Sequence, residues 1–173
     1  MELVKFNDPL ITSATTPFDF ANPVVEPLAF AQELIAKIYQ LKAYGLSVNQ
    51  IGLSFSCFGM KGSPNFVCFN PRIVDKSSHT ETLEEACLTF PGLFFDVERP
   101  SVIKVRFQTP NGETRTEKFT GLTARIFQHE MQHLNGEVFF KGKSRTAIEL
   151  AVRRSKKIGV NYPVGELYKM AKI

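Results

Sequence analysis

Residues 128–136 read Gln-His-Glu-Met-Gln-His-Leu-Asn-Gly and carry the strongest chemical signal of this chain. On a helix, His129 and His133 lie one turn apart on the same face, because they are four residues apart. Two neutral imidazoles placed in this way can bind one divalent metal ion, and Glu130 between them is typical of a general base beside a metal-activated water. The alternative is a surface helix with two solvated histidines.

The neighbouring residues favour histidines that point inward. Leu122 and Ile126 precede them at helical spacing, so an apolar stripe continues into the histidines. A buried imidazole needs a polar partner, and a metal ion would be one. Thr120 or Gly121 can start this helix and Gly136 can end it in the left-handed conformation, which predicts a helix of about 14 residues.

A tetrahedral catalytic metal site uses three protein ligands, and few candidates for the third exist. Cys57 and Cys68 lie among strand-forming apolar residues, which favours a buried hydrophobic role, and His79 lies in a polar loop. Cys87 differs, because it lies between acidic residues and a Pro-Gly turn. A thiolate next to carboxylates is disfavoured unless a cation stabilises it.

Three segments together resemble the motifs of peptide deformylases. The family motif Gly-hydrophobic-Gly-hydrophobic-Ala-Ala-x-Gln is similar to Ala-Tyr-Gly-Leu-Ser-Val-Asn-Gln at 43–50. The motif Glu-Gly-Cys-Leu-Ser is similar to Glu-Ala-Cys-Leu-Thr at 85–89, and Gln-His-Glu-x-Asp-His-Leu to residues 128–134. The motifs occur in the family's order and approximate spacing, and the resemblance spans roughly residues 1–142.

The chain departs from these motifs most clearly at five positions. The departures are Ala43 and Ala86 in place of glycines, Ser47 and Val48 in place of alanines, and Gln132 in place of an aspartate. In the family that aspartate pairs with an arginine, for which Arg99 is the candidate here, so we expect the loss of an ion pair. The departures indicate a divergent member with altered substrate preference or stability, while the groups needed for the chemistry are retained.

The resemblance implies that Cys87, His129 and His133 are the metal ligands. A Cys-His-His set suits Fe²⁺, Zn²⁺, Ni²⁺ or Co²⁺, and the resemblance favours Fe²⁺ as the native ion. The implied activity is removal of the formyl group from the N-terminal formyl-methionine of nascent peptides, with release of formate.

The resemblance also assigns the residues that act on the reacting amide. Glu130 is the general base, and the Gln50 side-chain amide and the Leu88 backbone N–H donate to the oxyanion. Without the resemblance, Gln50 would be interpreted as a solvated loop glutamine.

The residues expected around the substrate are Tyr44, Gly45, Ala86, Leu122, Arg125 and Ile126. Leu122 and Ile126, with Tyr44, would line an apolar slot for the methionine side chain. The peptide backbone would pair as an added strand near Gly45 and Ala86. Arg125 occupies a position that is commonly apolar in the family, so either it narrows the slot or its stem packs while its charged head reaches solvent. Ordinary core packing is the alternative for the apolar residues.

Length and composition predict a single catalytic domain over residues 1–173, with a C-terminal helix and tail over about 144–173. Three cysteines without paired spacing argue against a disulfide framework and favour the reducing cytoplasm. We expect no secretory signal, no membrane partner and no DNA partner. The net charge of +4 permits only weak attraction to ribosomal RNA.

Hydrophobic periodicity predicts an α+β fold. The resemblance to peptide deformylases implies antiparallel or mixed β-sheets around the central metal-binding helix, with one helix near each end of the chain. An extended arm over 7–27 precedes a helix that starts at Pro27 and stops before Gly45. Further elements are expected as strands at about 52–59, 66–75, 101–108 and 114–119 and as a helix at about 145–158, followed by a tail that Pro163 and Gly165 break.

Two features leave alternatives open. The basic stretch at 153–157 could contact ribosomal RNA, or it could simply place positive charge at a helix C-terminus. The histidine motif also occurs in other metal-dependent peptidases, which usually take a third ligand downstream, where Glu137 and Glu149 are the candidates. A catalytically weak relative that binds nascent peptides is the third alternative.

Overall fold

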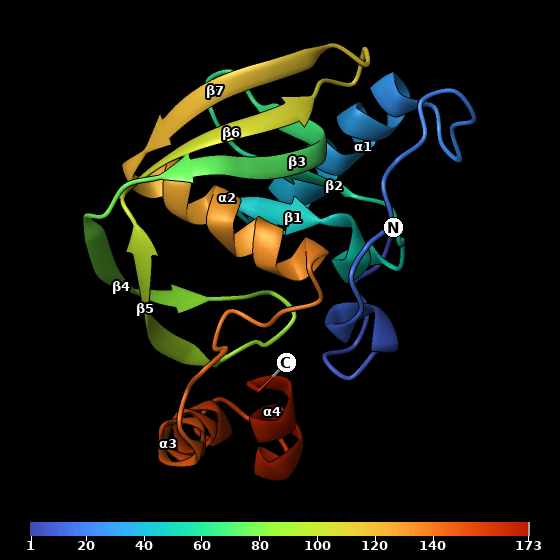
Figure 1. The fold of residues 1–173 in the computed structure, drawn as a ribbon. Coiled ribbons are helices and arrows are strands. Elements are labelled where there is room, and N and C mark those ends of the chain that lie inside the picture. Colours follow the sequence, from blue (N-terminus) through green and yellow to red (C-terminus); the bar gives the residue numbers. More distant parts are fainter. Residues whose placement is uncertain (173) are drawn as a thin grey trace.

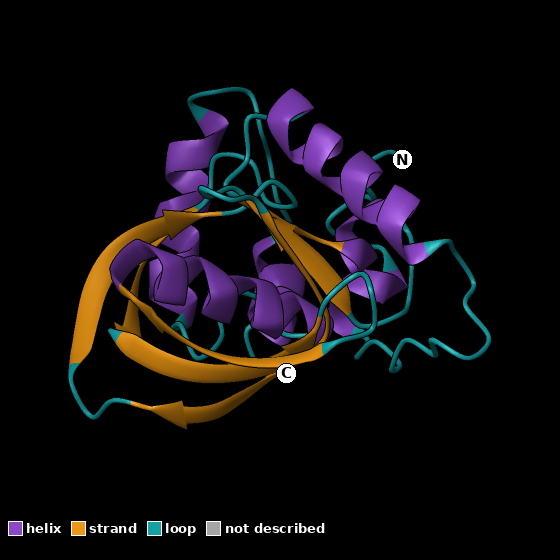
Figure 2. Cartoon of the chain, turned by 90° about the horizontal axis from the view of Figure 1, so that it is seen from above, coloured by secondary structure: helices purple, strands orange, loops and turns teal. Residues whose placement is uncertain are grey.

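The helix α2 (Gly121–Leu134) lies between two β-sheets (Figure 1). The computed structural model describes residues 1–172. The larger sheet is antiparallel throughout, with the strand order β1-β2-β3-β6-β7, and it curves around α2 (Figure 2). Its strands are β1 (Gly45–Ser47), β2 (Cys57–Met60), β3 (Phe66–Lys76), β6 (Val102–Gln108) and β7 (Thr114–Thr120). The smaller sheet pairs β4 (Thr80–Ala86) with β5 (Phe94–Pro100).

Strands β3, β6 and β7 form where the sequence predicts them. In β6, Ile103, Val105 and Phe107 are buried while the residues between them are exposed, which is the alternation of a sheet with one solvated face. Gly112, with φ of +81°, lies in the turn that joins β6 to β7.

The expected strand over 52–59 is wrong in its extent. Residues Val48–Ile51 form a 3₁₀ helix, η2, which ends at Gly52 with φ of +85°. The chain then reaches β2 through an irregular segment, in which only Phe55 forms an isolated bridge. Strand β2 therefore begins at Cys57.

Strands β1, β4 and β5 were not predicted from the sequence. Strand β4 is exposed at nearly every position and so has no apolar alternation. Strand β5 does alternate, but Arg99 is one of its buried positions and interrupts the hydrophobic pattern. A strand whose inner face is polar does not stand out in a hydrophobicity profile.

The N-terminal helix α1 (Pro27–Gln40) starts as predicted, with Pro27 in its first turn. The Glu26 carboxylate accepts hydrogen bonds from the first free N–H groups and caps this end. The arm before it contains one 3₁₀ turn, η1 (Pro9–Thr12), which buries Ile11.

The C-terminal region contains two helices where one was predicted. Helix α3 (Arg145–Lys156) is capped by Ser144, whose Oγ accepts a hydrogen bond from the Ala147 N–H. The expected broken tail is wrong, because α4 (Val164–Met170) follows. Pro163 precedes the first turn, where its missing N–H costs no helical bond, and the helix buries Leu167.

The buried side chains form two phenylalanine-rich clusters. One lies between the large sheet, α1 and α2 and includes Phe58, Phe69 and Phe127. The other includes Phe90 and Phe140 and packs against the C-terminal helices. Among residues 1–172, no helix is both long and apolar enough to cross a bilayer.

Candidate metal centre

Three potential metal ligands converge although about forty residues separate them in the chain. The ligand atoms of Cys87, His129 and His133 all lie within 4.8 Å of one another. Cys87 directly follows β4, and its Sγ lies 3.1 Å from His133 Nε2. The two histidines lie one turn apart on α2, with ring centroids separated by 5.2 Å.

The donor set fits a divalent metal ion. The Nδ1 atom of His129 lies 3.0 Å from the Glu85 carboxylate, which fixes the ring and leaves Nε2 available for coordination. Within residues 1–172, Nδ1 of buried His133 has no hydrogen-bond partner, while its Nε2 faces Cys87. One sulfur and two imidazole nitrogens are ligands for zinc and for late divalent transition metals.

The charges of the three groups are coupled to one another. Burial disfavours the Cys87 thiolate, but His133 and His129 hold the pKa of this thiol well below its usual range. Burial opposes the charge of His129 too, yet hydrogen bonds with Cys87 and Glu85 raise its pKa to about 10. A metal cation can take the place of these protons, because it binds the thiolate and the neutral imidazoles.

The other two cysteines have no such setting. Cys57 and Cys68 are fully buried in the first cluster, and burial raises the pKa of each thiol well above its usual value. They are small hydrophobic side chains, as the sequence predicts.

Glu130 lies on α2 beside the histidines and is 4% exposed. Burial raises the pKa of its carboxyl, although the two histidines and a hydrogen bond from Ser47 oppose the shift. The Ser47 hydroxyl donates to Oε2 over 2.7 Å. A buried carboxylate with a raised pKa is suited to accept and return a proton near neutral pH.

Gln50 is buried at the same site and is therefore not a solvated loop residue. Its Oε1 accepts from the Ser47 backbone N–H over 2.9 Å, which fixes the side-chain amide. Its Nε2 donates to Thr89 Oγ1 over 3.0 Å and faces Cys87 Sγ at 3.6 Å. The amide donor group thus points at the potential metal ligands.

A cavity of about 470 Å³ opens onto these groups. It is lined by all six residues that the sequence places around the substrate: Tyr44, Gly45, Ala86, Leu122, Arg125 and Ile126. Gln50, Leu88 and Glu130 line it as well. Leu122 is 58% exposed, so the expected inward stripe is wrong at this position, which belongs to the open mouth of the cavity.

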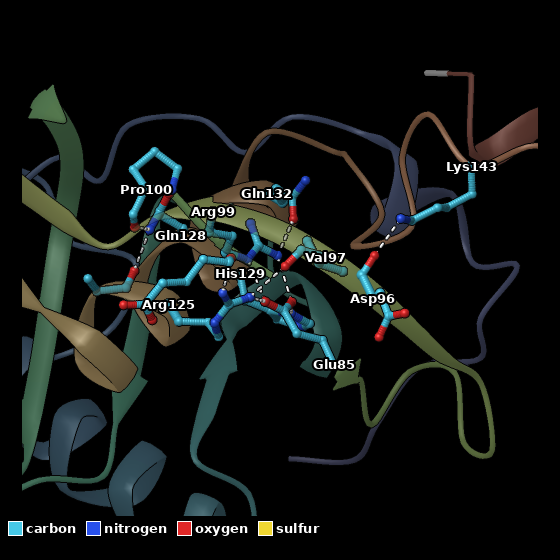
Figure 3. A network of polar contacts seen from close by, with 12 residues as sticks. Glu85, Asp96, Val97, Arg99, Pro100, Arg125, Gln128, His129, Gln132 and Lys143 are labelled. Atoms are coloured by element: carbon cyan, nitrogen blue, oxygen red, sulfur yellow. Dashed lines mark hydrogen bonds and ion pairs between the residues drawn. The ribbon is translucent and has the colours of Figure 1, made fainter. Parts of the chain in front are cut away.

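Arg125 does not extend its charged head into solvent, contrary to one expectation. Its Nη1 donates to Glu85 Oε1 over 2.7 Å and to the Val97 carbonyl over 2.9 Å, and its Nη2 donates to the Glu81 carbonyl (Figure 3). Arg125 is 7% exposed and joins α2 to both strands of the smaller sheet. The sequence gives little sign of this, because arginine is usually exposed.

Glu85 is the centre of the polar network that supports His129 (Figure 3). Its carboxylate accepts from Arg99 Nε over 2.6 Å and Nη2 over 2.7 Å, and from Arg125. Burial opposes its charge, but Arg99 and His129 lower its pKa to about 2. Arg99 also donates to Gln132 Oε1 over 2.7 Å, so in place of the ion pair that we expected to be lost the guanidinium has a hydrogen bond to a neutral amide oxygen.

Comparison with known proteins identifies the family. The polypeptide deformylase family model matches residues 1–149. Peptide deformylase of Thermotoga neapolitana is 34% identical over 150 residues, which cover 86% of this chain and 90% of that protein. The structure of Thermotoga maritima peptide deformylase has a TM-score of 0.74 at 34% identity, covering 79% of this chain and 92% of that one.

A peptide deformylase from Synechococcus elongatus in complex with actinonin has a TM-score of 0.82 at 26% identity, covering 90% of this chain and 86% of that chain. The predicted fold class is therefore confirmed. Because the family match covers most of the sequence and the relatives align over most of their length, this chain belongs to the polypeptide deformylase family.

Proposed function

We propose that Cys87, His129 and His133 hold one divalent metal ion and that Glu130 is the general base of a deformylation reaction. Members of the family are metal-dependent hydrolases that act on N-formyl-methionyl nascent peptides. The observation that carries the residue assignment is the convergence of the three ligand atoms within 4.8 Å, with Cys87, His129 and Glu130 lining the same cavity.

The residues divide the chemistry between them. A divalent ion in such a site supplies a Lewis acid that lowers the pKa of water and polarises a carbonyl. Glu130 takes a proton from the attacking water and returns it to the leaving amine, so that formate and a free N-terminus result. Gln50 Nε2 and the Leu88 backbone N–H donate to the formyl oxygen as negative charge develops on it.

The residues that line the cavity support a formyl-methionyl peptide as the substrate. The methionine side chain contacts Ile126 and the half-exposed apolar groups of Leu122 and Tyr44 at the mouth. The peptide backbone runs as an added strand between the segments that contain Gly45 and Ala86. The aliphatic stem of Arg125 borders this space, while its guanidinium is held by Glu85.

We infer Fe²⁺ as the native ion from the family resemblance, with Zn²⁺, Ni²⁺ and Co²⁺ as substitutes, because all of these ions accept mixed sulfur and nitrogen ligands. Metal analysis of protein purified without oxygen tests this order. The cytoplasmic location and the single domain over 1–173 stay predictions.

The basic end of α3 offers a contact for ribosomal RNA. Arg153, Arg154 and Lys156 lie in its last turn. Co-sedimentation with ribosomes at low and high salt tests this contact, since an electrostatic interaction weakens as salt rises.

A peptidase that takes its third ligand downstream of α2 has less support. Glu137 forms an ion pair with Lys141 over 2.7 Å, and Glu149 pairs with Arg145 over 3.2 Å. Cys87 lies next to His133 instead.

Formate release from a formyl-methionyl peptide by anaerobically prepared, iron-loaded protein tests the function, with cleavage of internal peptide bonds as the contrasting assay. Glu130→Gln keeps the shape of the side chain but removes its proton-accepting group. We expect it to retain wild-type metal content and to lose at least 99% of turnover, on the order of the general-base contribution. Wild-type turnover in this variant would exclude Glu130 as the base.

A further inference from the structure

Strand β1 places two of its residues against the proposed base. Because side chains alternate along a strand, Gly45 and Ser47 share one face, and Glu130 of α2 contacts both. Ser47 is fully buried, so its hydroxyl has no water to bond with in place of protein groups. It lies 2.7 Å from Glu130 Oε2 and 3.1 Å from the backbone carbonyl oxygen of the same residue.

Gly45 constrains the other carboxylate oxygen. A Cβ atom at this position would lie 2.5 Å from Glu130 Oε1 and 2.9 Å from its Cδ. The missing side chain thus leaves the space in which Oε1 lies at the edge of the cavity. One oxygen is held by a hydrogen bond, and the absence of a side chain at Gly45 leaves room for the other in this orientation of the carboxylate.

We propose that Ser47 is a positioning residue for Glu130. The Ser47 hydroxyl holds the Glu130 carboxylate with Oε1 toward the bound substrate. This inference rests on the proposed role of Glu130 as the base. Serine stands here where the family motif has alanine, so this chain has a hydroxyl that the motif itself does not require. Because the family motif has alanine at this position, we expect the fold to tolerate the loss of the hydroxyl.

The two acceptors on Glu130 allow the hydroxyl to bond throughout a proton transfer. A hydroxyl has one hydrogen to donate and two lone pairs to accept. While the carboxylate is ionised, Ser47 donates to Oε2, because a charge-assisted bond is the stronger one. When Oε1 carries the proton, Oε2 is still an acceptor, so the serine hydrogen can stay on Oε2 or turn to the Glu130 carbonyl. No atom has to move by more than a hydroxyl rotation.

Steady-state kinetics of Ser47→Ala in iron-loaded protein test the proposal. We expect kcat to fall about tenfold with KM within about twofold of wild type, since the lost bond is to a charged carboxylate and the Ser47 hydroxyl itself does not contact the substrate. Metal content should not change. The matched control is Ser155→Ala, which removes another fully buried hydroxyl, one that bonds Val152 and Val160 carbonyls in the second cluster. It should lower Tm and leave kcat unchanged.

Two further variants separate the effect of the Ser47 hydrogen bond from the effect of side-chain volume. Ser47→Thr restores a donor and should recover most of the lost kcat, whereas Ser47→Cys has a weak donor of similar shape and should resemble Ser47→Ala. In the Glu130→Gln background, Ser47→Ala should change the residual rate by less than about twofold, because a residue that acts through another has no effect once that partner is removed.

An unchanged kcat in Ser47→Ala, a full additional loss in the Glu130→Gln background, or a change confined to KM would overturn the proposal. A crystal structure of the metal-loaded alanine variant gives a readout independent of activity, because the Glu130 carboxylate should occupy more than one orientation. A single, wild-type orientation would refute the positioning role. If the wild-type protein releases no formate, the proposed function fails. The crystal structure of the Ser47→Ala variant then still decides whether Ser47 positions the Glu130 carboxylate.

Discussion

Glu85→Gln removes the charge at the centre of the network that supports His129. In the folded protein, the Glu85 carboxylate pairs with Arg99 and Arg125 and bonds His129 Nδ1. The glutamine amide keeps the size of the side chain, but it leaves two buried guanidinium groups without a counter-charge. Breaking a buried ion pair by removing one partner typically costs about 3–5 kcal/mol.

The pKa of Glu85 gives a second measure of this cost. Its lowering from 4.5 to about 2 corresponds to about 3 kcal/mol, at about 1.4 kcal/mol per pKa unit. Residual solvent screening reduces this to about 2–3 kcal/mol. For a chain of this length, we expect Tm to fall by about 5–10 °C.

The stability that Glu85 contributes must depend on pH. Because its folded pKa lies below its unfolded value of 4.5, the contribution is complete above pH 4.5 and is lost as the pH falls toward about 2. The wild-type protein should therefore lose more stability than the glutamine variant over this window. Chemical denaturation at several pH values, carried out on metal-free protein, measures the difference.

The same variant should weaken metal binding by about 10- to 100-fold, because His129 loses the partner that orients its ring. The control is Glu81→Gln, the same change on an exposed side chain of β4. Differential scanning fluorimetry and competition with a chelator measure both effects. If Glu85→Gln unfolds within 1 °C of Glu81→Gln and binds metal equally well, the network does not have the energetic role that its geometry indicates.

Two other substitutions test the site itself. Cys87→Ser replaces a low-pKa thiol with a hydroxyl that ionises far less readily. The metal content after dialysis should therefore fall well below that of wild type. An unchanged metal content and an unchanged rate would mean that another group is the ligand. Gly45→Ala places a Cβ atom 2.5 Å from Glu130 Oε1 and should lower kcat by more than about tenfold by displacing the base. Wild-type kcat in Gly45→Ala would show that the carboxylate can move without loss, and metal analysis separates this effect from a loss of metal.

The convergence of the proposed metal ligands could be predicted from the sequence, whereas the smaller sheet that supports them could not. The spacing of His129 and His133 determines a shared helix face, and the surroundings of Cys87 mark it as unlike the other cysteines. Gln50 needed the family motif, because a glutamine in a loop has no local signal of burial. Leu122 was misplaced because an apolar residue at the mouth of a cavity has the same spacing as one in a core.

The smaller sheet was missed for a physical reason that bears on the site. Its strands bury Glu85 and Arg99, and the neighbouring helix adds Arg125, so charged residues occupy positions that a hydrophobicity profile assigns to solvent. These charges are stable inside the protein only because the carboxylate pairs with both guanidinium groups and Arg125 bonds backbone carbonyls of both strands. A purely apolar sheet would give a clearer sequence pattern, but it would provide no acceptor for His129. The polar face that hides β4 and β5 from a hydrophobicity profile is therefore the same face that holds the imidazole of His129, a proposed metal ligand, in place.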